Sequence, residues 1–195
     1  MVPSVRTPWR LSAAVSVLGC LMLSGPVGRV HAFPSTGEYE LKAAFLVNFG
    51  GFVRWPLSAF EDGRSPFAIC IFGDDPFGDG FEPFRNRTVA GRPLEVRSPA
   101  SPEAARQTCH VLFIAGSAGP RIPEILRELN RAAILTVSDL DDFAGSGGMI
   151  QLFIRDKKIH FTINRDAAGA AGLKIDARLL KLAEPGGVLA GEQRR

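Results

Sequence analysis

Residues 67–78 read FAICIFGDDPFG, an apolar run that ends at a glycine and two aspartates. A run of six apolar residues has the length of a β-strand, and an unbroken run is typical of a strand covered on both faces. Two further runs of this kind follow, at His110–Ile114 and Ala133–Val137, and a shorter one lies near Leu94–Arg97. Buried strands of this type occur in sheets with helices on both sides, which predicts an α/β fold.

The segments around these runs have helical spacing. Glu38–Val53 is expected to be a helix that Pro56 ends, because the residue before a proline avoids the helical region. One face of this helix is predicted from residues that recur every three or four positions, namely Leu41, Phe45, Asn48, Phe49 and Phe52. Ile122–Asn130 has a similar pattern, and Ala177–Ala183 is expected to be a short helix capped by Asp176.

The last third of the chain predicts a β-hairpin. Met149–Arg155 and Lys158–Asn164 flank the pair Asp156-Lys157, which has the length of a hairpin turn. Alternation places apolar residues on one face, namely Ile150, Leu152, Ile154, Ile159, Phe161 and Ile163. The fold expected from the whole pattern is a single-domain α/β sandwich. Its sheet is mixed and mostly parallel, and the C-terminal hairpin and helix close it.

The other face of the hairpin is the candidate surface for recognition of a partner. It carries Gln151, Phe153, His160 and Thr162. A mixture of polar and aromatic side chains is typical of protein interfaces. The alternative interpretation is a sheet face that lies half covered under a helix. A charged residue at position 153 separates the two, because it disturbs folding in the second case and partner binding in the first.

Residues 1–32 have the features of a secretory signal peptide. Arg6 and Arg10 precede an apolar run over 11–23, and Val30-His31-Ala32 resembles a cleavage site. The run is shorter than the roughly 20 residues of a transmembrane helix. An uncleaved anchor and a lipoprotein cut before Cys20 are the alternatives. The expected organisation is a signal peptide over 1–32, a folded domain over 33–184 and a flexible tail over 185–195, with no membrane insertion after cleavage.

Cleavage also balances the charge. The chain has 23 basic and 20 acidic residues, and three of the basic ones but none of the acidic ones lie in residues 1–32. The mature part therefore carries 20 of each. An excess of positive charge is the electrostatic requirement for binding nucleic acid or an anionic membrane. The sequence therefore gives no reason to expect either as a partner.

Two cysteines, Cys70 and Cys109, remain after cleavage. An exported pair in an oxidising compartment is expected to form a disulfide. Two buried free thiols are the alternative, because both residues lie in apolar runs. A zinc site could be drawn from these cysteines together with His110 and His160, but neither histidine has another ligand at a metal-like spacing. No metal site is therefore predicted.

Three short motifs suggest chemistry but have simpler explanations. Asp74 and Asp75 follow the first buried strand, and Asp75 before a proline is better explained as a helix cap. Ser117 does not lie in a G-x-S-x-G elbow. The glycine-rich segment 145–148 precedes a strand, whereas phosphate loops follow one, although a close approach by a ligand is left open there. We therefore predict no catalytic residue and no cofactor.

Taken together, these segments resemble the YfiR-like family of exported bacterial proteins. The residues that carry the resemblance lie in order over about 38–184. They are Leu41–Phe45 with Asn48, Phe49, Phe52, Trp55 and Pro56; Ile71–Gly78; Leu135–Asp139 with Phe143; Gly147–Ile150; Ile159–Asn164; Gly172–Ile175; and Leu179–Ala183. A bridge between Cys70 and Cys109 fits the family, whereas a second cysteine pair found in some members is missing here. Gly50 and Gly51 also depart from the family pattern and predict close packing.

The resemblance implies a periplasmic regulator without catalytic activity. The best understood member binds the periplasmic part of an inner-membrane diguanylate cyclase and holds it inactive, which lowers cyclic di-GMP, exopolysaccharide and biofilm formation. Other members serve different membrane sensors, including histidine kinases. The expected partner is therefore an inner-membrane sensor or diguanylate cyclase with a periplasmic domain. The alternative is a periplasmic small-molecule binder that tunes such a sensor, and a homodimer is left open.

Overall fold

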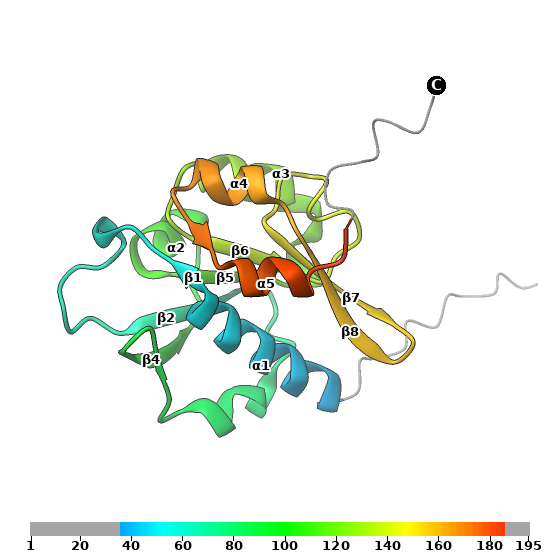
Figure 1. Cartoon of the computed structure of the whole chain (residues 1–195), viewed down its shortest axis with the longest axis horizontal. Coiled ribbons are helices and arrows are strands. Elements are labelled where there is room, and N and C mark those ends of the chain that lie inside the picture. Colours follow the sequence, from blue (N-terminus) through cyan, green and yellow to red (C-terminus); the bar gives the residue numbers. More distant parts are fainter. Residues whose placement is uncertain (1–35, 186–195) are drawn as a thin grey trace, which may run out of the picture. The chain divides into compact units, whose positions relative to one another are not determined.

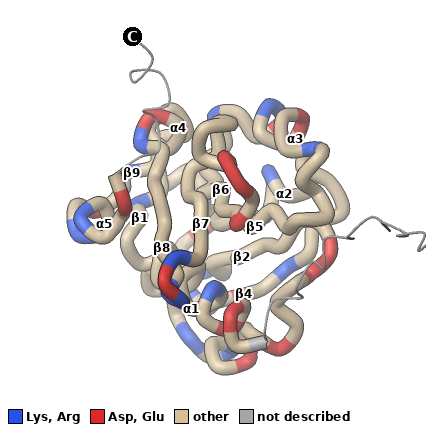
Figure 2. The backbone as a smooth tube through the Cα atoms, turned by 90° about the vertical axis from the view of Figure 1, so that its right-hand side faces the viewer, with Lys and Arg blue, Asp and Glu red and all other residues tan. Residues whose placement is uncertain are grey.

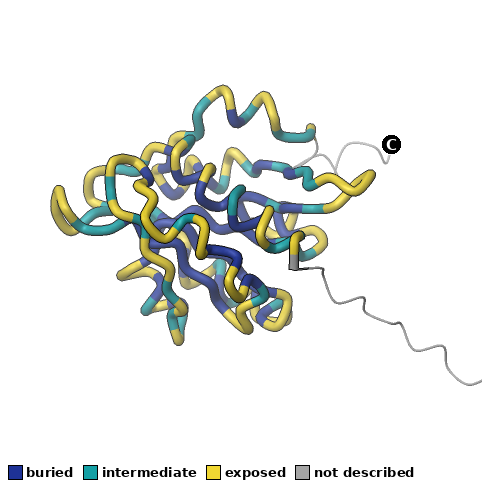
Figure 3. The backbone as a smooth tube through the Cα atoms, turned by 90° about the horizontal axis from the view of Figure 1, so that it is seen from below, coloured by how far each residue is buried: buried dark blue, intermediate teal, exposed yellow. Residues whose placement is uncertain are grey.

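The computed structural model describes residues 36–185. The predicted signal peptide lies outside these residues, and so does the predicted tail beyond Pro185. Within this part of the chain, no helix combines the length and the hydropathy needed to cross a membrane. Figure 3 shows that the buried segments lie at the centre of the fold and the exposed ones around it.

A mixed seven-stranded sheet forms the centre of the fold, with the strand order β3-β4-β2-β5-β6-β7-β8 (Figure 1). Strands β4, β2, β5, β6 and β7 run parallel, and β3 and β8 are antiparallel at the two edges. The bounds are β2 Phe67–Phe72, β3 Thr88–Val89, β4 Arg92–Arg97, β5 Val111–Ile114, β6 Leu135–Ser138, β7 Ile150–Arg155 and β8 Lys158–Ile163. This confirms the predicted mixed, mostly parallel sheet.

Helices cover both faces of the sheet. The side chains of β2 point alternately to the two faces of the sheet and enter two separate cores. Phe67, Ile69 and Ile71 belong to one core, and Ala68, Cys70 and Phe72 belong to the other. Helices α1, η2, α4 and α5 contribute to the first core, and α2, η3 and α3 contribute to the second. The bounds are α1 Thr36–Phe52, η1 Leu57–Ala59, η2 Gly78–Phe84, α2 Pro102–Thr108, η3 Gly116–Arg121, α3 Ile122–Glu128, α4 Arg165–Ala170 and α5 Ala177–Leu182.

Helix α1 buries a face that matches the predicted one in part. Phe49 is buried and Phe45 and Phe52 pack against the core, as predicted, but Leu41 and Asn48 are exposed and Leu46 is fully buried instead. The prediction was wrong for Leu41 and Asn48 because apolar residues occur on nearly every side of this helix, so their spacing does not single out one face. Gly50 packs closely, as predicted, since a Cβ atom there would lie 2.5 Å from the Val89 side chain, whereas a Cβ atom at Gly51 would meet open space.

Strands β7 and β8 form the predicted hairpin. Asp156 and Lys157 both have positive φ values, 51° and 59°, which is the backbone of a two-residue type I′ turn. Ile150 and Leu152 are fully buried, but Ile154 is 52 % exposed. The prediction that Ile154 is covered was therefore wrong, because it lies two residues from the turn.

Several short elements were not predicted from the sequence, among them α2, β1 and β9. Helix α2 begins after Ser101, whose Oγ accepts a hydrogen bond from Ala104 N at 3.1 Å. A serine followed by a proline is a helix-start signal, so this helix could have been found. Strands β1 (Val53–Arg54) and β9 (Lys174–Ile175) form a separate two-stranded sheet, which is too short to leave a pattern in the sequence.

Candidate functional site

The four predicted recognition residues lie together on one face of the β7–β8 hairpin. Phe153 is paired with His160, and Gln151 is paired with Thr162. All four are partly buried. Helices α2 and α3 cover this side of the sheet over β2, β5 and β6. Phe153, the one hydrophobic residue of the four, belongs to neither hydrophobic core of the described residues. Gln151 Oε1 accepts a hydrogen bond from Ala144 N at 3.3 Å, so the segment after β6 contacts one end of this face.

Aromatic rings and a cation dominate this face. The rings of Phe153 and His160 stack with their centroids 5.7 Å apart and their planes 20° apart. The guanidinium carbon of Arg155 lies 5.8 Å from the centre of the Phe153 ring, within the range of a cation–π contact. Aromatic and arginine side chains are the residue types enriched at the energetic centres of protein interfaces.

Glu184 completes this face, although it lies far away in the sequence. Its backbone N–H donates to the carbonyl of Phe161 at 2.8 Å, so the segment after α5 lies along the free edge of β8. Its carboxylate lies 2.9 Å from Nδ1 of His160 and forms an ion pair with Arg155. Partial burial would raise the pKa of Glu184, but the contacts with His160 and Arg155 lower it overall. This network orients both side chains on the face.

A second polar cluster lies at the start of α1. Lys42 is only 3 % exposed, and its Nζ lies 2.5 Å from a Glu38 oxygen and 2.6 Å from an Asp139 oxygen. The Tyr39 hydroxyl donates to the same Asp139 oxygen at 2.9 Å. Because Asp139 directly follows β6, these contacts tie the first helix to the carboxyl end of the sheet.

The chemistry of this cluster is structural. Burial and the negative charge of Asp139 raise the pKa of Tyr39, so the phenol stays protonated and acts as a hydrogen-bond donor. The ammonium of Lys42 contacts two carboxylates, which compensates its charge in the interior. The sequence revealed the lysine but not its burial, because its partner Asp139 lies 97 residues away.

The structure joins Cys70 and Cys109 in a disulfide, with their Cα atoms 5.8 Å apart. The bridge ties β2 to the end of α2, and both sulfurs are therefore committed to it rather than to a metal. Next to it, His110 accepts a hydrogen bond from Ala68 N at Nδ1 and contacts the Ala59 carbonyl through Nε2, each at 3.0 Å. Burial lowers the pKa of His110.

The remaining motifs close loops. The Asp75 carboxylate accepts a hydrogen bond from Phe77 N at 2.7 Å. The predicted cap is therefore corrected to a turn, because the next helix, η2, begins only at Gly78. Ser117 Oγ accepts a hydrogen bond from Asp74 N at 2.7 Å, which joins the loops after β2 and β5. Gly148 lies against the Phe143 ring, because a Cβ atom built on this glycine would be only 2.2 Å from a ring carbon of Phe143.

Figure 2 shows basic and acidic residues interspersed along the chain in that view. Among residues 36–185, no group of three or more histidine, cysteine, aspartate or glutamate side chains is placed to hold a metal ion. The hairpin face is therefore the candidate functional site that the predicted residues support.

The comparisons with known proteins agree with this architecture. No curated protein sequence matches the chain. The model of the YfiR/HmsC-like family matches residues 39–184, which include both strands of the hairpin, Glu184, the disulfide, and Lys42 with Tyr39 and Asp139. The match extends over most of the chain, and the chain therefore belongs to the YfiR/HmsC-like family.

Proposed function

We propose that the protein is a non-enzymatic regulator of the periplasm that binds the periplasmic part of an inner-membrane signalling protein and restrains it. A membrane-bound diguanylate cyclase is the partner that fits best, so that binding lowers cyclic di-GMP, exopolysaccharide and biofilm formation. Family membership supports the regulatory role. The balanced charge of the sequence after residue 32 fits a protein partner better than a nucleic acid.

The observation that carries this proposal is the incompletely covered face of the hairpin. Phe153 and His160 form a stacked pair whose orientation is held by Glu184. Ordered aromatic side chains bind at a low cost in conformational entropy because few rotatable bonds are lost. Gln151 and Thr162 lie beside this pair and offer hydrogen-bonding groups at its border. We propose that this face contacts the partner.

Replacement of Phe153 by aspartate tests the proposal. Ile154→Asp is the matched control, because it introduces the same charge at the neighbouring position on the opposite face of the strand, where the side chain is 52 % exposed. In a strain that lacks the gene, wild-type protein and Ile154→Asp are expected to restore low cyclic di-GMP, and Phe153→Asp is expected to fail while melting at a similar temperature.

Two results would contradict the proposal. Full restoration of low cyclic di-GMP by Phe153→Asp would show that the face does not contact the partner. A large loss of thermal stability in Phe153→Asp, with no such loss in Ile154→Asp, would assign Phe153 to the core. The melting curves therefore separate the two interpretations of the hairpin face.

A small-molecule sensor that tunes a histidine kinase or another membrane protein is the second candidate function. The observation in its favour is a hollow at the other end of the sheet from Asp74 and Ser117, described below. A thermal-shift screen against metabolites tests this role, and the absence of any stabilising compound would count against it.

A further inference from the structure

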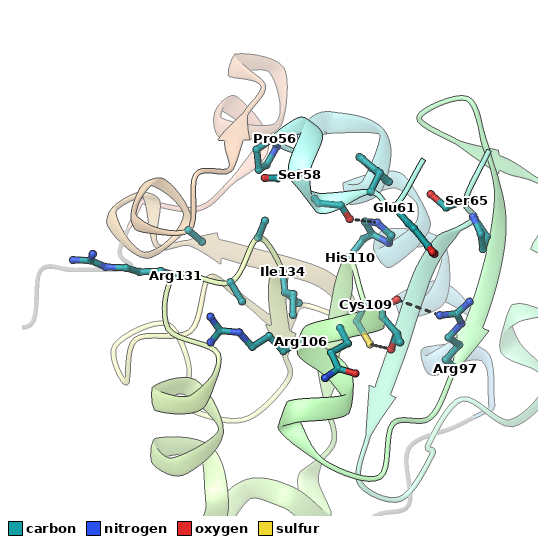
Figure 4. A pocket seen from close by; sticks show the side chains of 18 residues that line it. Pro56, Ser58, Glu61, Ser65, Arg97, Arg106, Cys109, His110, Arg131 and Ile134 are labelled. Carbon is teal, nitrogen blue, oxygen red and sulfur yellow. Dashed lines mark hydrogen bonds between the residues drawn. The ribbon is translucent and has the colours of Figure 1, made fainter. Parts of the chain in front are cut away.

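A hollow of about 560 Å³ lies at the amino ends of strands β2, β5 and β6 (Figure 4). Its walls come from the loop over 56–66, the end of α2 and the segment over 131–134. Volumes of this size hold small organic ligands in many proteins. Asp74 and Ser117, by contrast, follow the carboxyl ends of β2 and β5.

Positive charge exceeds negative charge around this hollow. Arg97, Arg106 and Arg131 line it, together with one acidic residue, Glu61. Arg97 is paired with Glu95, but Arg106 and Arg131 have no carboxylate within 4.0 Å among residues 36–185. Arg106 donates one hydrogen bond, to the carbonyl of Glu128, and a guanidinium has five N–H donors. Donors for an anion are therefore available on both residues.

Arg131 has an unusual backbone conformation for its position. It follows α3 with a φ of 60°, in the left-handed region where glycine or asparagine is favoured. Strained residues of this kind concentrate at binding sites, where the side chain has a role that glycine cannot fill. Figure 4 shows Arg106 and Arg131 on one side of the hollow, with the Arg131 side chain extending outward at its rim, and Arg97 at the opposite side.

Part of the wall of this mostly polar hollow is apolar, and the loop that supplies it is held in place. Pro56, Ala133 and Ile134 supply hydrocarbon surface. The loop that carries Pro56 is fixed to the floor by the contact of Ala59 with His110 and by the stacking of the Phe60 ring on His110, with centroids 4.5 Å apart. A site that exists before binding loses less entropy when the ligand enters.

We propose that this hollow binds a small organic anion. Arg106 and Arg131 hold its acidic group, and its apolar part lies against Pro56, Ala133 and Ile134. Guanidinium groups suit this role because they form paired, charge-assisted hydrogen bonds with carboxylates and phosphates. The proposal does not depend on a partner at the hairpin face, and the two can fail separately.

Nuclear magnetic resonance titrations of the arginine side chains test this proposal. Three compounds that share a phenyl ring serve as probes: benzoate, phenyl phosphate and the uncharged benzamide. We expect saturable shifts with at least one anion at concentrations up to about 10 mM, and weaker or no binding of benzamide. The anion that binds more tightly then shows whether the hollow prefers a carboxylate or a phosphate.

Three variants locate the site. Arg131→Gly removes the charge and suits the positive φ, so it preserves the fold, and Arg106→Gln removes the second charge. Each is expected to weaken anion binding about tenfold or more. Arg127→Gln is the matched control, since Arg127 is an exposed arginine on α3, four residues before Arg131, and does not line the hollow, and it should bind like wild type.

Any of four outcomes would overturn the proposal. The first is the absence of saturation with both anions. The second is equal binding of benzamide, which would show that the arginines are not used. The third is an equal loss of affinity in Arg127→Gln and Arg131→Gly, which would indicate a general effect of charge. Folded variants that retain wild-type affinity would equally contradict the assignment of Arg106 and Arg131.

Discussion

Lys42 is 3 % exposed, although lysine is among the residues least often buried. Its contacts with Glu38 and Asp139 explain why the burial is tolerated. The sequence could not predict this, because a lysine in a helical segment is normally solvated and its partner Asp139 lies 97 residues away in the sequence. Gly50 was predictable as a site of close packing, but its neighbour Val89 was not.

Lys42→Met is predicted to lower the free energy of unfolding by about 3 kcal/mol, because it leaves two partly buried carboxylates without their cation. Urea unfolding followed by circular dichroism measures this change. Lys181→Met is the control, since Lys181 is exposed on α5 and its replacement should cost less than about 0.5 kcal/mol. Equal stabilities of the two variants would show that the Lys42 contacts contribute little.

The protein is predicted to lose free energy of unfolding in mild acid because of His110. Burial lowers the pKa of His110 in the folded protein below its ordinary value of 6.5, so the unfolded chain takes up the proton first. Stability from this residue is therefore complete above about pH 6.5 and falls as the pH drops toward the lowered pKa. Protonation also removes the acceptor that Nδ1 offers to Ala68 N.

Urea unfolding at about pH 7.5 and about pH 5.5 checks this dependence. Wild-type protein is expected to lose more stability between the two conditions than His110→Gln, which cannot titrate there. The contribution of the carboxyl groups to the change in stability is the same in both proteins, because both contain the same carboxyl groups, so it cancels in the comparison. Identical losses in the two proteins would mean that His110 does not titrate in this window.

At the scale of elements, the sequence predicted most strands and helices correctly. The unbroken apolar runs marked β2, β5 and β6, and Asp156-Lys157 marked the hairpin turn. Helix α2 was missed although Ser101 signals its start, and the β1–β9 pair was missed because two-residue strands have no periodicity. The hairpin face was predicted from alternation, whereas Glu184 was not, since it arrives there through the packing of α5.

The bridge between β2 and the end of α2 predicts a stability effect at this scale. Replacement of Cys70 and Cys109 by alanine should lower the free energy of unfolding by about 4 kcal/mol, because the bridge closes a long loop in the unfolded chain. The two cysteines are 39 positions apart. Urea unfolding of wild type with and without reductant, beside the double variant, provides the measurement. Unchanged midpoints would contradict the prediction.

At the scale of the whole molecule, the two candidate sites lie in different parts of the sheet. The hairpin face is at the β8 edge, and the hollow is at the amino ends of the central strands. The sequence could indicate the first because its residues alternate within one hairpin. It could not indicate the second, which several distant segments enclose. We infer that one molecule presents a partner surface and a separate ligand site.

The central claim is that the hairpin face binds a membrane signalling protein. A photo-reactive phenylalanine placed at position 153, in cells that make the protein at its natural level, tests this claim most directly. The control has the same group at Glu103, an exposed position on α2, which lies toward the other end of the sheet (Figure 1). After illumination, position 153 should crosslink to an inner-membrane protein with a periplasmic domain, identified by mass spectrometry, and position 103 should not. The account would be contradicted if position 153 captured no such protein, or if both positions captured it equally.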